Sequence, residues 1–409
     1  MTSTKLQFAA ALCAGIGLLS LTPAQAATAP TTPGTSLAAL LARLKADEAK
    51  RATDEATMTS QAETMTSQAE TITHQGAVIA TLQSQISAVA GVPKNAALLA
   101  QTPVPAPGYT YTGNFVAVSG SAWTYQASMK TARDFPAAAT IGNTIYALGG
   151  FNNGLLSSVE AYDPATNTWA SKANMSTARY APAAASVGNT LYALGGDSNT
   201  GVILSSVEAY DPATNTWTNK ASMNTNRTRL AAASVGNTLY ALGGSNNSVG
   251  PLSSVEAYDP ATNTWTNKAS MNTARRTLAA ASVGNTLYAL GGSNNSGDLS
   301  SVEAYDPTAN TWTNKASMNS ARYDLAAASV GSTLYALGGY HSGSLSSVEA
   351  YDPATNTWAA SASMNSARYD LAAASVGNTL YALGGYNNSI GSLSSVEAIT
   401  LGYFVHLKN

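Results

Sequence analysis

Charged residues are scarce in this chain, and neither sign of charge dominates. Only 10% of the 409 residues are Asp, Glu, Lys or Arg, and the formal net charge is −2. Because binding to nucleic acid depends on a strong basic field, this balance argues against a nucleic-acid partner. The polar surface must come from Asn, Ser and Thr, which are concentrated in the second half of the chain.

Cysteine is almost absent as well. The single cysteine, Cys13, lies in an N-terminal stretch typical of a secretory signal peptide, with basic Lys5, an apolar run from Phe8 to Leu21, and the cleavage sequence Ala24-Gln25-Ala26. The apolar run is too short to span a bilayer. We therefore expect residues 1–26 to be removed and the protein to be exported, either to the periplasm or to the cell exterior or surface. The mature chain would have no thiol and no membrane span.

Proline is absent between residues 36 and 90, and Gly76 is the only glycine there. The sequence TMTSQAE occurs twice in succession, at Thr57–Glu63 and Thr64–Glu70, which gives a period of seven. This period predicts a helical or coiled-coil stem over residues 36–90 that forms a homo-oligomer, with a trimer favoured. A partly helical tether is the alternative, because threonine is a mediocre helix former.

Proline-containing and irregular segments flank this stem. Residues 27–35 are expected to be disordered. Residues 91–118 contain Pro93, Pro103, Pro105 and Pro107 and are expected to form a linker. Residues 402–409 form a C-terminal tail with strand character.

Six repeats of similar sequence fill the rest of the chain. Each contains an arginine, an alanine-rich run, a sequence related to GNTLYALGG, a variable loop, and then VEAYDP and NTW or their relatives. The glycine pairs lie about 47 residues apart, a period typical of propellers and solenoids. The pairs are Gly149-Gly150, Gly195-Gly196, Gly243-Gly244, Gly291-Gly292, Gly338-Gly339 and Gly384-Gly385. Each repeat contains four short predicted strands.

This pattern resembles the kelch repeat, in which a hydrophobic run ends in a double glycine and is followed by a spaced Tyr and Trp. The resemblance covers about Ser119 to Leu401. It implies an all-β, six-bladed kelch β-propeller over residues 119–401, in which each blade has four antiparallel strands around a central channel.

The chain has six tryptophans but only five Asp-Pro turns of the YDPATNTW type. Trp123 precedes the first glycine pair, whereas the last repeat ends at Leu401 with neither the turn nor a tryptophan. An incomplete last blade would expose an unpaired strand edge. We predict that an N-terminal strand around Ala122–Tyr125 closes the sixth blade, although the tail over 402–409 could compete for the same edge. The repeated turn is then structural.

One arginine recurs directly before the innermost predicted strand of every repeat. The six are Arg133, Arg179, Arg227, Arg275, Arg322 and Arg368. They could form a basic ring at the channel mouth that binds carboxylates or phosphates. Alternatively, each could pair with the glutamate that also recurs six times, and the equal numbers favour this pairing.

Ligand binding is expected where nearly identical repeats differ. In kelch domains that bind peptides, the residues just after the glycine pair and just after the arginine line one face of the ring, as the resemblance implies. The ligand-binding candidates are Arg133, Arg179, Tyr180, Arg229, Arg276, Arg322, Tyr323, Tyr340, Arg368, Tyr369 and Tyr386. These residue types suit recognition of a protein or glycan. Ordinary polar loop tips are the alternative interpretation.

Catalysis has little support in the sequence. Copper oxidases built on this fold use a thioether-linked Cys–Tyr pair, and the mature chain would have no cysteine. Sialic-acid mutarotases share the six-bladed kelch ring and use Glu and Arg, but nearly every Glu and Arg here belongs to the repeat. The asparagine-rich loops offer calcium only Asp197 and Asp298. We expect a non-catalytic binding protein with neither cofactor nor metal; a sugar-acid enzyme and a structural envelope protein are the alternatives.

Overall fold

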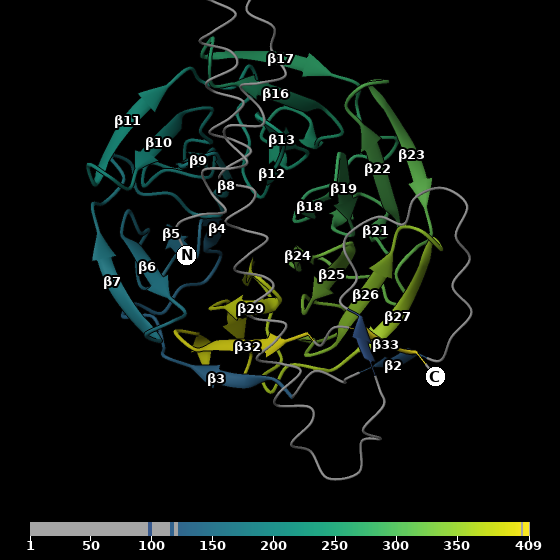
Figure 1. Ribbon diagram of the computed structural model, residues 1–409. Coiled ribbons are helices and arrows are strands. Elements are labelled where there is room, and N and C mark those ends of the chain that lie inside the picture. Colours follow the sequence, from purple (N-terminus) through teal and green to yellow (C-terminus); the bar gives the residue numbers. More distant parts are fainter. Residues whose placement is uncertain (1–96, 100–114, 118–121, 402–403, 409) are drawn as a thin grey trace, which may run out of the picture. The chain divides into compact units, whose positions relative to one another are not determined.

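The computed structural model describes residues 97–99, 115–117, 122–401 and 404–408. Residues 122–401 form a closed ring of six four-stranded antiparallel sheets (Figure 1), so the predicted six-bladed propeller is confirmed. The predicted signal peptide, the segment 27–35 and the stem over 36–90 lie outside the described residues. Within the described part of the chain, no helix is long and apolar enough to cross a membrane.

The first five blades each use four strands in chain order, from the central channel outward. Blade 1 contains β4 (Ala137–Ile141), β5 (Thr144–Leu148), β6 (Val159–Asp163) and β7 (Thr168–Lys172). Blade 2 contains β8 (Ala183–Val187), β9 (Thr190–Leu194), β10 (Val207–Asp211) and β11 (Thr216–Lys220). Blade 3 contains β12 (Ala231–Val235), β13 (Thr238–Leu242), β16 (Val255–Asp259) and β17 (Thr264–Lys268). Blade 4 contains β18 (Ala279–Val283), β19 (Thr286–Leu290), β22 (Val302–Asp306) and β23 (Thr311–Lys315). Blade 5 contains β24 (Ala326–Val330), β25 (Thr333–Leu337), β26 (Val348–Asp352) and β27 (Thr357–Ser361).

Three blades also carry a two-residue hairpin in the loop after the glycine pair. These hairpins are β14 (Ser245–Asn246) with β15 (Gly250–Pro251), β20 (Ser293–Asn294) with β21 (Gly297–Asp298), and β30 (Tyr386–Asn387) with β31 (Gly391–Ser392).

The sixth blade is built from both ends of the propeller sequence. It consists of β28 (Ala372–Val376), β29 (Thr379–Leu383), β32 (Val396–Thr400) and the N-terminal strand β3 (Thr124–Gln126). Strand β3 pairs antiparallel with β32, with Thr124 opposite Ala398 and Gln126 opposite Val396. In Figure 1, β3 lies beside β32 at the outside of the ring. The predicted closure is therefore confirmed.

The C-terminal tail does not occupy this edge. Its strand β33 (Phe404–Lys408) pairs with β2 (Phe115–Ala117), with Phe115 opposite His406. Strand β2 lies in the segment predicted as a linker, and so does a further three-residue strand, β1 (Ala97–Leu99).

Every tryptophan joins its own blade to the preceding one. The indole nitrogen of Trp123, in the sixth blade, donates a hydrogen bond to the Ala362 carbonyl at 2.8 Å. The same contact recurs from Trp169 to Ala127, Trp217 to Ala173, Trp265 to Ala221, Trp312 to Ala269 and Trp358 to Ala316. The composite sixth blade is thus joined to its neighbours in the same way as the other five.

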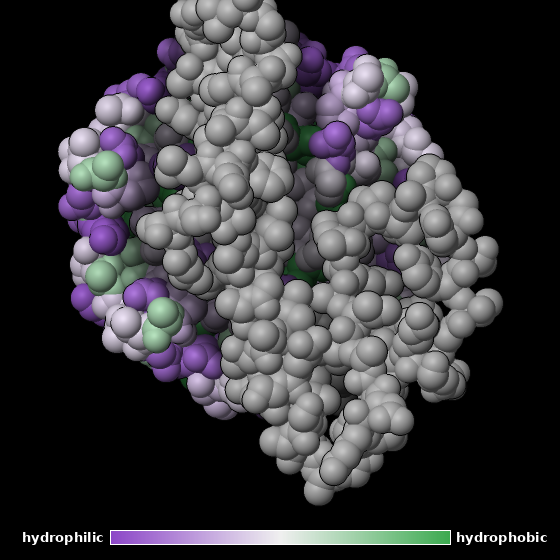
Figure 2. All heavy atoms as spheres, in the orientation of Figure 1, coloured by the Kyte–Doolittle hydropathy of each residue, from purple (hydrophilic) through white to green (hydrophobic). Residues whose placement is uncertain are grey.

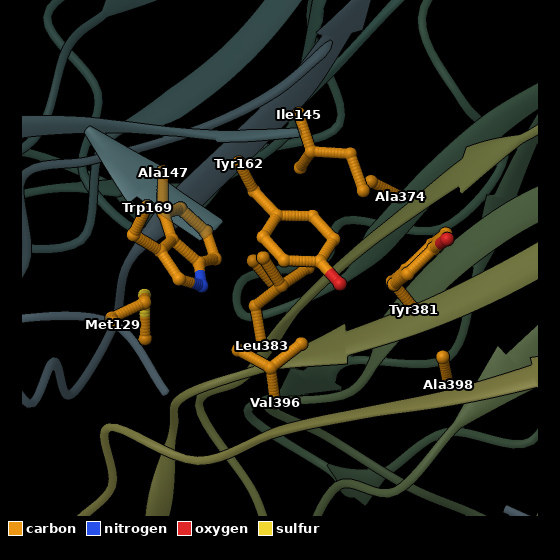
Figure 3. Packing of buried hydrophobic residues seen from close by; sticks show 11 residues of the cluster. Met129, Ile145, Ala147, Tyr162, Trp169, Ala374, Tyr381, Leu383, Val396 and Ala398 are labelled. Atoms are coloured by element: carbon orange, nitrogen blue, oxygen red, sulfur yellow. The ribbon is translucent and has the colours of Figure 1, made fainter. Parts of the chain in front are cut away.

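The hydrophobic core consists of six clusters, each between two neighbouring blades. Figure 3 shows the cluster between blades 6 and 1, where Tyr162 points between Trp169 and Tyr381. The ring centres of Tyr162 and Trp169 are 5.1 Å apart, and those of Tyr162 and Tyr381 are 5.8 Å apart. Because each sheet is covered by a neighbour on both faces, its second strand can be apolar throughout, as Ile145-Tyr146-Ala147-Leu148 is.

The Asp-Pro turns have the structural role that the sequence suggested. In the first, the Asp163 carboxylate accepts hydrogen bonds from the Ala165 amide and the Thr166 hydroxyl. Asn167 has a φ of 53°, and its side-chain oxygen accepts hydrogen bonds from the Tyr162 hydroxyl and the Ala127 amide. The turn therefore closes one hairpin and links it to the preceding blade.

Large hydrophobic side chains are exposed at only a few of the described positions. These are Tyr125, Phe151, Val202, Val249 and Ile390. Along the left rim of the ring in Figure 2, hydrophobic residues occur as small separate spots among hydrophilic ones. No broad apolar area is visible along that rim.

Candidate functional site

The glycine pair of each repeat places two variable positions side by side. A Cβ atom on Gly150 would lie only 2.5 Å from the Asp134 carbonyl oxygen, and Gly150 has a φ of +90°, so only glycine fits. Its amide donates to the Arg179 carbonyl of the next blade at 2.9 Å. The next residue, Phe151, exchanges two backbone hydrogen bonds with Asp134, at 2.8 and 3.0 Å.

The same bridge occurs in all six blades. The bridged pairs are Asp134–Phe151, Tyr180–Asp197, Thr228–Ser245, Arg276–Ser293, Tyr323–Tyr340 and Tyr369–Tyr386. The residue after the glycine pair and the residue after the recurring arginine are therefore adjacent in every blade, around one mouth of the channel.

The recurring arginines themselves do not reach this surface. All six are fully buried, at 0% exposed, and pair with the recurring glutamates at 2.6–2.9 Å. The pairs are Arg133–Glu160, Arg179–Glu208, Arg227–Glu256, Arg275–Glu303, Arg322–Glu349 and Arg368–Glu397. The arginines therefore form internal ion pairs and not a basic ring at the channel mouth. Four of the predicted ligand-binding residues are placed beyond a ligand's reach: Arg133, Arg179, Arg322 and Arg368.

Blade 4 shows how these pairs hold the backbone. Arg275 Nη1 donates to the carbonyls of Gly291 and Ser301, both at 2.9 Å. The Glu303 carboxylate accepts hydrogen bonds from the Asn272 amide at 2.6 Å and the Thr273 amide at 3.1 Å. Burial lowers the pKa of Arg275, although the bond to Glu303 opposes this shift. Arginine remains charged at neutral pH, so the site is an ion pair.

The channel mouth is lined by the second residue after each recurring arginine. All six residues have left-handed backbone conformations, with φ between 47° and 54°. They are Phe135, Ala181, Arg229, Thr277, Asp324 and Asp370. Together with the residues that follow them, they surround a cavity of about 90 Å³.

Backbone hydrogen bonds pass from blade to blade around this mouth. The amides of five of these residues donate to the carbonyls of their counterparts in a neighbouring blade. The bonds are Asp370 to Asp324 (2.8 Å), Asp324 to Thr277 (3.0 Å), Thr277 to Arg229 (2.9 Å), Arg229 to Ala181 (3.2 Å) and Phe135 to Asp370 (3.1 Å). These bonds hold non-glycine residues in a conformation they rarely adopt, so the side chains at the mouth are fixed by the ring.

Blades 5 and 6 carry four tyrosines on this face, which we call the tyrosine arc. The arc consists of Tyr323, Tyr340, Tyr369 and Tyr386. Successive ring centres are 5.5, 5.2 and 5.4 Å apart, and all four side chains are partly exposed. The arc is therefore a connected aromatic surface with polar hydroxyl groups.

Aromatic side chains of blades 1 and 2 also lie at the mouth. The ring centres of Tyr180 and Phe135 are 4.8 Å apart, and those of Tyr180 and Phe151 are 6.2 Å apart. The Arg229 guanidinium lies 5.7 Å from the Phe135 ring centre and 5.9 Å from that of Tyr180. These distances are typical of cation–π contacts.

Comparison with known families agrees with this geometry. The sequence matches the Kelch motif over residues 132–176 and the KLHDC2/KLHL20/DRC7 Kelch-repeats domain over residues 182–385. The chain belongs to the kelch-repeat family. Propellers of this family typically serve as scaffolds for protein interactions.

A solved kelch structure, that of YjhT, has the same fold. The two align with a TM-score of 0.59 and 16% sequence identity, over 69% of this chain and 99% of that chain. At this identity the likeness shows the fold alone. No curated protein matches the sequence.

The face that carries the tyrosine arc also contains three acidic residues, at positions where the repeats differ but outside the set of predicted ligand-binding residues. Asp134, Asp324 and Asp370 come from blades 1, 5 and 6, which are neighbours in the closed ring. The sequence does contain a signal for two of them, because Tyr-Asp follows the recurring arginine only in the last two repeats. The remaining predicted residues, Tyr180, Arg229, Arg276 and the tyrosine arc, all lie on this face or line its mouth.

Burial disfavours the charged form of these carboxyl groups. It raises the pKa of Asp134 and of Asp324 to about 6. Burial raises the pKa of Asp370 well above its usual value, and the charges of Asp324 and Asp134 add to the effect. At neutral pH the channel mouth therefore holds carboxyl groups whose ionisation depends strongly on the charges and hydrogen bonds of neighbouring groups.

Within the described residues, no group of three or more His, Cys, Asp and Glu side chains could hold a metal ion. His341 forms a pair with Asp298, with its Nδ1 3.1 Å from the carboxylate, but this pair is at the surface of the loops.

The Asp370→Asn variant should be more stable than the wild type at pH 7, with a melting temperature about 3–6 °C higher. The folded-state pKa of Asp370 is raised, so its destabilising contribution is absent below the unfolded pKa and grows as the pH rises above that value. Asparagine has the same shape without the charge. Thermal unfolding monitored by circular dichroism should therefore show a gain at pH 7 and almost none at pH 3.5. Asp298→Asn serves as the control, and an equal gain at both pH values would contradict the prediction.

Proposed function

We propose that this kelch protein is a non-catalytic binding protein that acts outside the cytoplasm and recognises a protein or glycan through the face that carries the tyrosine arc. The observation that carries this proposal is the tyrosine arc. Tyrosine combines a large apolar ring with a hydroxyl group and loses little conformational entropy on binding, so it is common in recognition surfaces.

Other blades act as internal controls for the role of these tyrosines. Thr228 and Ser245 occupy the equivalent positions in blade 3, and Arg276 and Ser293 occupy them in blade 4. Both pairs form the same backbone bridge without any aromatic ring. Folding of a blade therefore does not require aromatic residues here, which supports a role in binding for the arc.

Recognition outside the cytoplasm is supported by the N-terminal sequence. The basic residue, short apolar run and Ala24-Gln25-Ala26 motif are typical of a secretory signal peptide. A stem that oligomerises would bring several tyrosine faces together and increase the avidity for a surface with repeated epitopes.

Glycan and peptide arrays should detect ligands of the wild-type protein, and replacing Tyr323, Tyr340 and Tyr369 together with Ala should reduce their signal at least about tenfold. A reduction of this size corresponds to about 1.4 kcal/mol, which is modest for the loss of three aromatic contacts. Tyr125→Ala is the matched control, because Tyr125 is 60% exposed on the outer strand β3. Array ligands that bind the triple variant as well as the wild type would refute the proposed face.

A sugar-acid enzyme, such as a sialic-acid mutarotase, is the second candidate. It is favoured by Asp324 and Asp370, which have raised pKa values, and by Arg229 at the same mouth, because these residues are not part of the repeated ion pairs. Accelerated mutarotation of sialic acid, followed by NMR, would put this function first. Absence of both mutarotation and array binding would favour a structural role in the envelope.

A further inference from the structure

Three carboxyl groups at the channel mouth have acceptor atoms without a partner. We call Asp134, Asp324 and Asp370 the acidic mouth. The Oδ1 atom of each is buried and has no hydrogen-bond partner among the described residues. Asp370 is only 6% exposed, and it lines the cavity of about 90 Å³ together with Asp324. Asp370 shares a hydrogen bond with Asp134 and another with Asp324, and each such bond between carboxyl groups needs a proton. A cationic donor from a ligand could take the place of these protons and also reach the acceptors that have no partner.

The cations of the surrounding blades do not fill this need. Among the described residues, neither Arg229 nor Arg276 forms an ion pair with the acidic mouth. Arg229 lies over the rings of Phe135 and Tyr180 instead. The charges of Arg229 and Arg276 act on Asp324 only at a distance and favour its charged form. Thr277 also lines the cavity, and its hydroxyl group, which can donate or accept, has no hydrogen-bond partner among the described residues.

We propose that the acidic mouth binds the ammonium or guanidinium group of a lysine or arginine side chain from a peptide ligand. This inference rests on the proposed binding function and names the chemistry of the ligand. An ammonium group carries three N–H donors, and the cavity offers it the carboxyl groups of Asp324 and Asp370, with Asp134 beside Asp370. The positive charge also offsets the repulsion between neighbouring carboxylates.

The dimensions of the site favour a side chain on a slender stem. The cavity of about 90 Å³ is too small for a whole ligand, since sites for drug-sized molecules occupy roughly 300–1,000 Å³. Asp370 is nearly inaccessible from the surface, so an amino group attached directly to a sugar ring would not reach it. The methylene stem of lysine or arginine is slender and flexible, so it can carry a charged group into a narrow cavity.

Ionisation of the acidic mouth should be coupled to binding. A bound cation favours the charged carboxylates, so the affinity should fall as Asp134 and Asp324 become protonated below a pKa of about 6. The other charged or titratable groups near them include Arg229, Arg276, Tyr180, Tyr323 and Tyr369. These five keep their charge state between pH 5 and 7, because burial raises the pKa of all three tyrosines, to about 12 for Tyr180 and Tyr369, and arginine stays charged.

Calorimetric titration of the full chain tests this inference with Nα-acetyl-lysine amide, Nα-acetyl-arginine amide and the neutral Nα-acetyl-norleucine amide. At pH 7, at least one cationic probe should bind about tenfold more tightly than the norleucine probe. Lowering the pH to 5 should weaken that binding about fivefold or more, although the charge of the probe does not change. Asp370→Asn should weaken it to a similar extent, whereas Asp298→Asn should have no effect. Because Asp370→Asn is expected to be more stable than the wild type, unfolding would not explain the loss.

Several results would overturn the assignment. The first is equal affinity for the norleucine probe and the cationic probes. The second is calcium chloride, at millimolar concentration, that binds more tightly than the lysine probe and displaces it. The third is binding of glucosamine together with no binding of either cationic amino-acid probe. An array ligand that requires the tyrosine arc but is unaffected by Asp370→Asn would overturn this inference and leave the proposed function standing. Binding of the lysine probe that survives the triple tyrosine substitution would support the acidic mouth and count against the arc.

Discussion

Replacing Arg275 with methionine should lower the free energy of unfolding by about 3–5 kcal/mol. The substitution leaves the Glu303 carboxylate fully buried, at 0% exposed, without its positive partner. It also removes the donors to the carbonyls of Gly291 and Ser301, which methionine cannot replace. Unpaired buried charge is among the most costly defects in a protein, because water can no longer solvate it. Equilibrium unfolding in urea measures this loss, and the melting temperature should fall by about 10 °C.

The neighbouring residue provides a matched control for this experiment. Arg276 directly follows Arg275, but it lies next to Ser293 on the face that carries the tyrosine arc. Its side chain forms no ion pair with any described residue. Arg276→Met should change the free energy of unfolding by no more than about 0.5 kcal/mol. Equal losses for the two variants would show that the buried pair is not the cause.

Replacing Trp123 with alanine should destabilise the propeller by about 3–5 kcal/mol, even though Trp123 lies before the first complete repeat. Its side chain is 3% exposed and belongs to the cluster between blades 5 and 6, with Leu337 and Ile399. Its indole also donates to the Ala362 carbonyl, which would be left without that donor. The effect should appear as one cooperative shift of the unfolding transition, because opening one blade exposes the edge of the ring.

Tyr125→Ala tests whether this effect belongs to the closure or to any large residue of β3. Tyr125 is 60% exposed, and its hydroxyl forms a hydrogen bond with Ser366 at 2.9 Å on the surface. The loss of free energy should be no more than about 1 kcal/mol. A Trp123→Ala variant as stable as Tyr125→Ala would show that the N-terminal strand does not hold the ring together.

The closure could be predicted because repetition makes an exception visible. Five Asp-Pro turns and six tryptophans in six repeats leave one blade short of an outer strand and one tryptophan, Trp123, without a repeat of its own. Because an unpaired strand edge is a liability, the segment around Trp123 was expected to pair with the open edge of the incomplete blade. Nothing in the sequence of the tail over 402–409 ruled it out as a competitor, and only the pairing of β3 with β32 decides the question.

The chemistry of the mouth was harder to foresee. The sequence shows six recurring arginines and six recurring glutamates, and the equal numbers favour internal pairs over a basic ring. The burial that decides between the two cannot be read from the sequence. The acidic mouth depends on distance rather than on spacing, because Asp134 and Asp370 lie in the first and last blades and meet only when the ring closes. The left-handed backbone of Asp324 and Asp370, which directs their side chains, is likewise imposed by the neighbouring blades and not by local sequence preference.

The divided sixth blade has a consequence for how such a gene can change. Its two parts lie at opposite ends of the propeller sequence, and every complete unit lies between them. Copying or deleting one unit by unequal recombination would leave both parts of the closing blade unchanged in sequence. The sequence separates the repeats that can diversify from the two strands, β3 and β32, that close the ring.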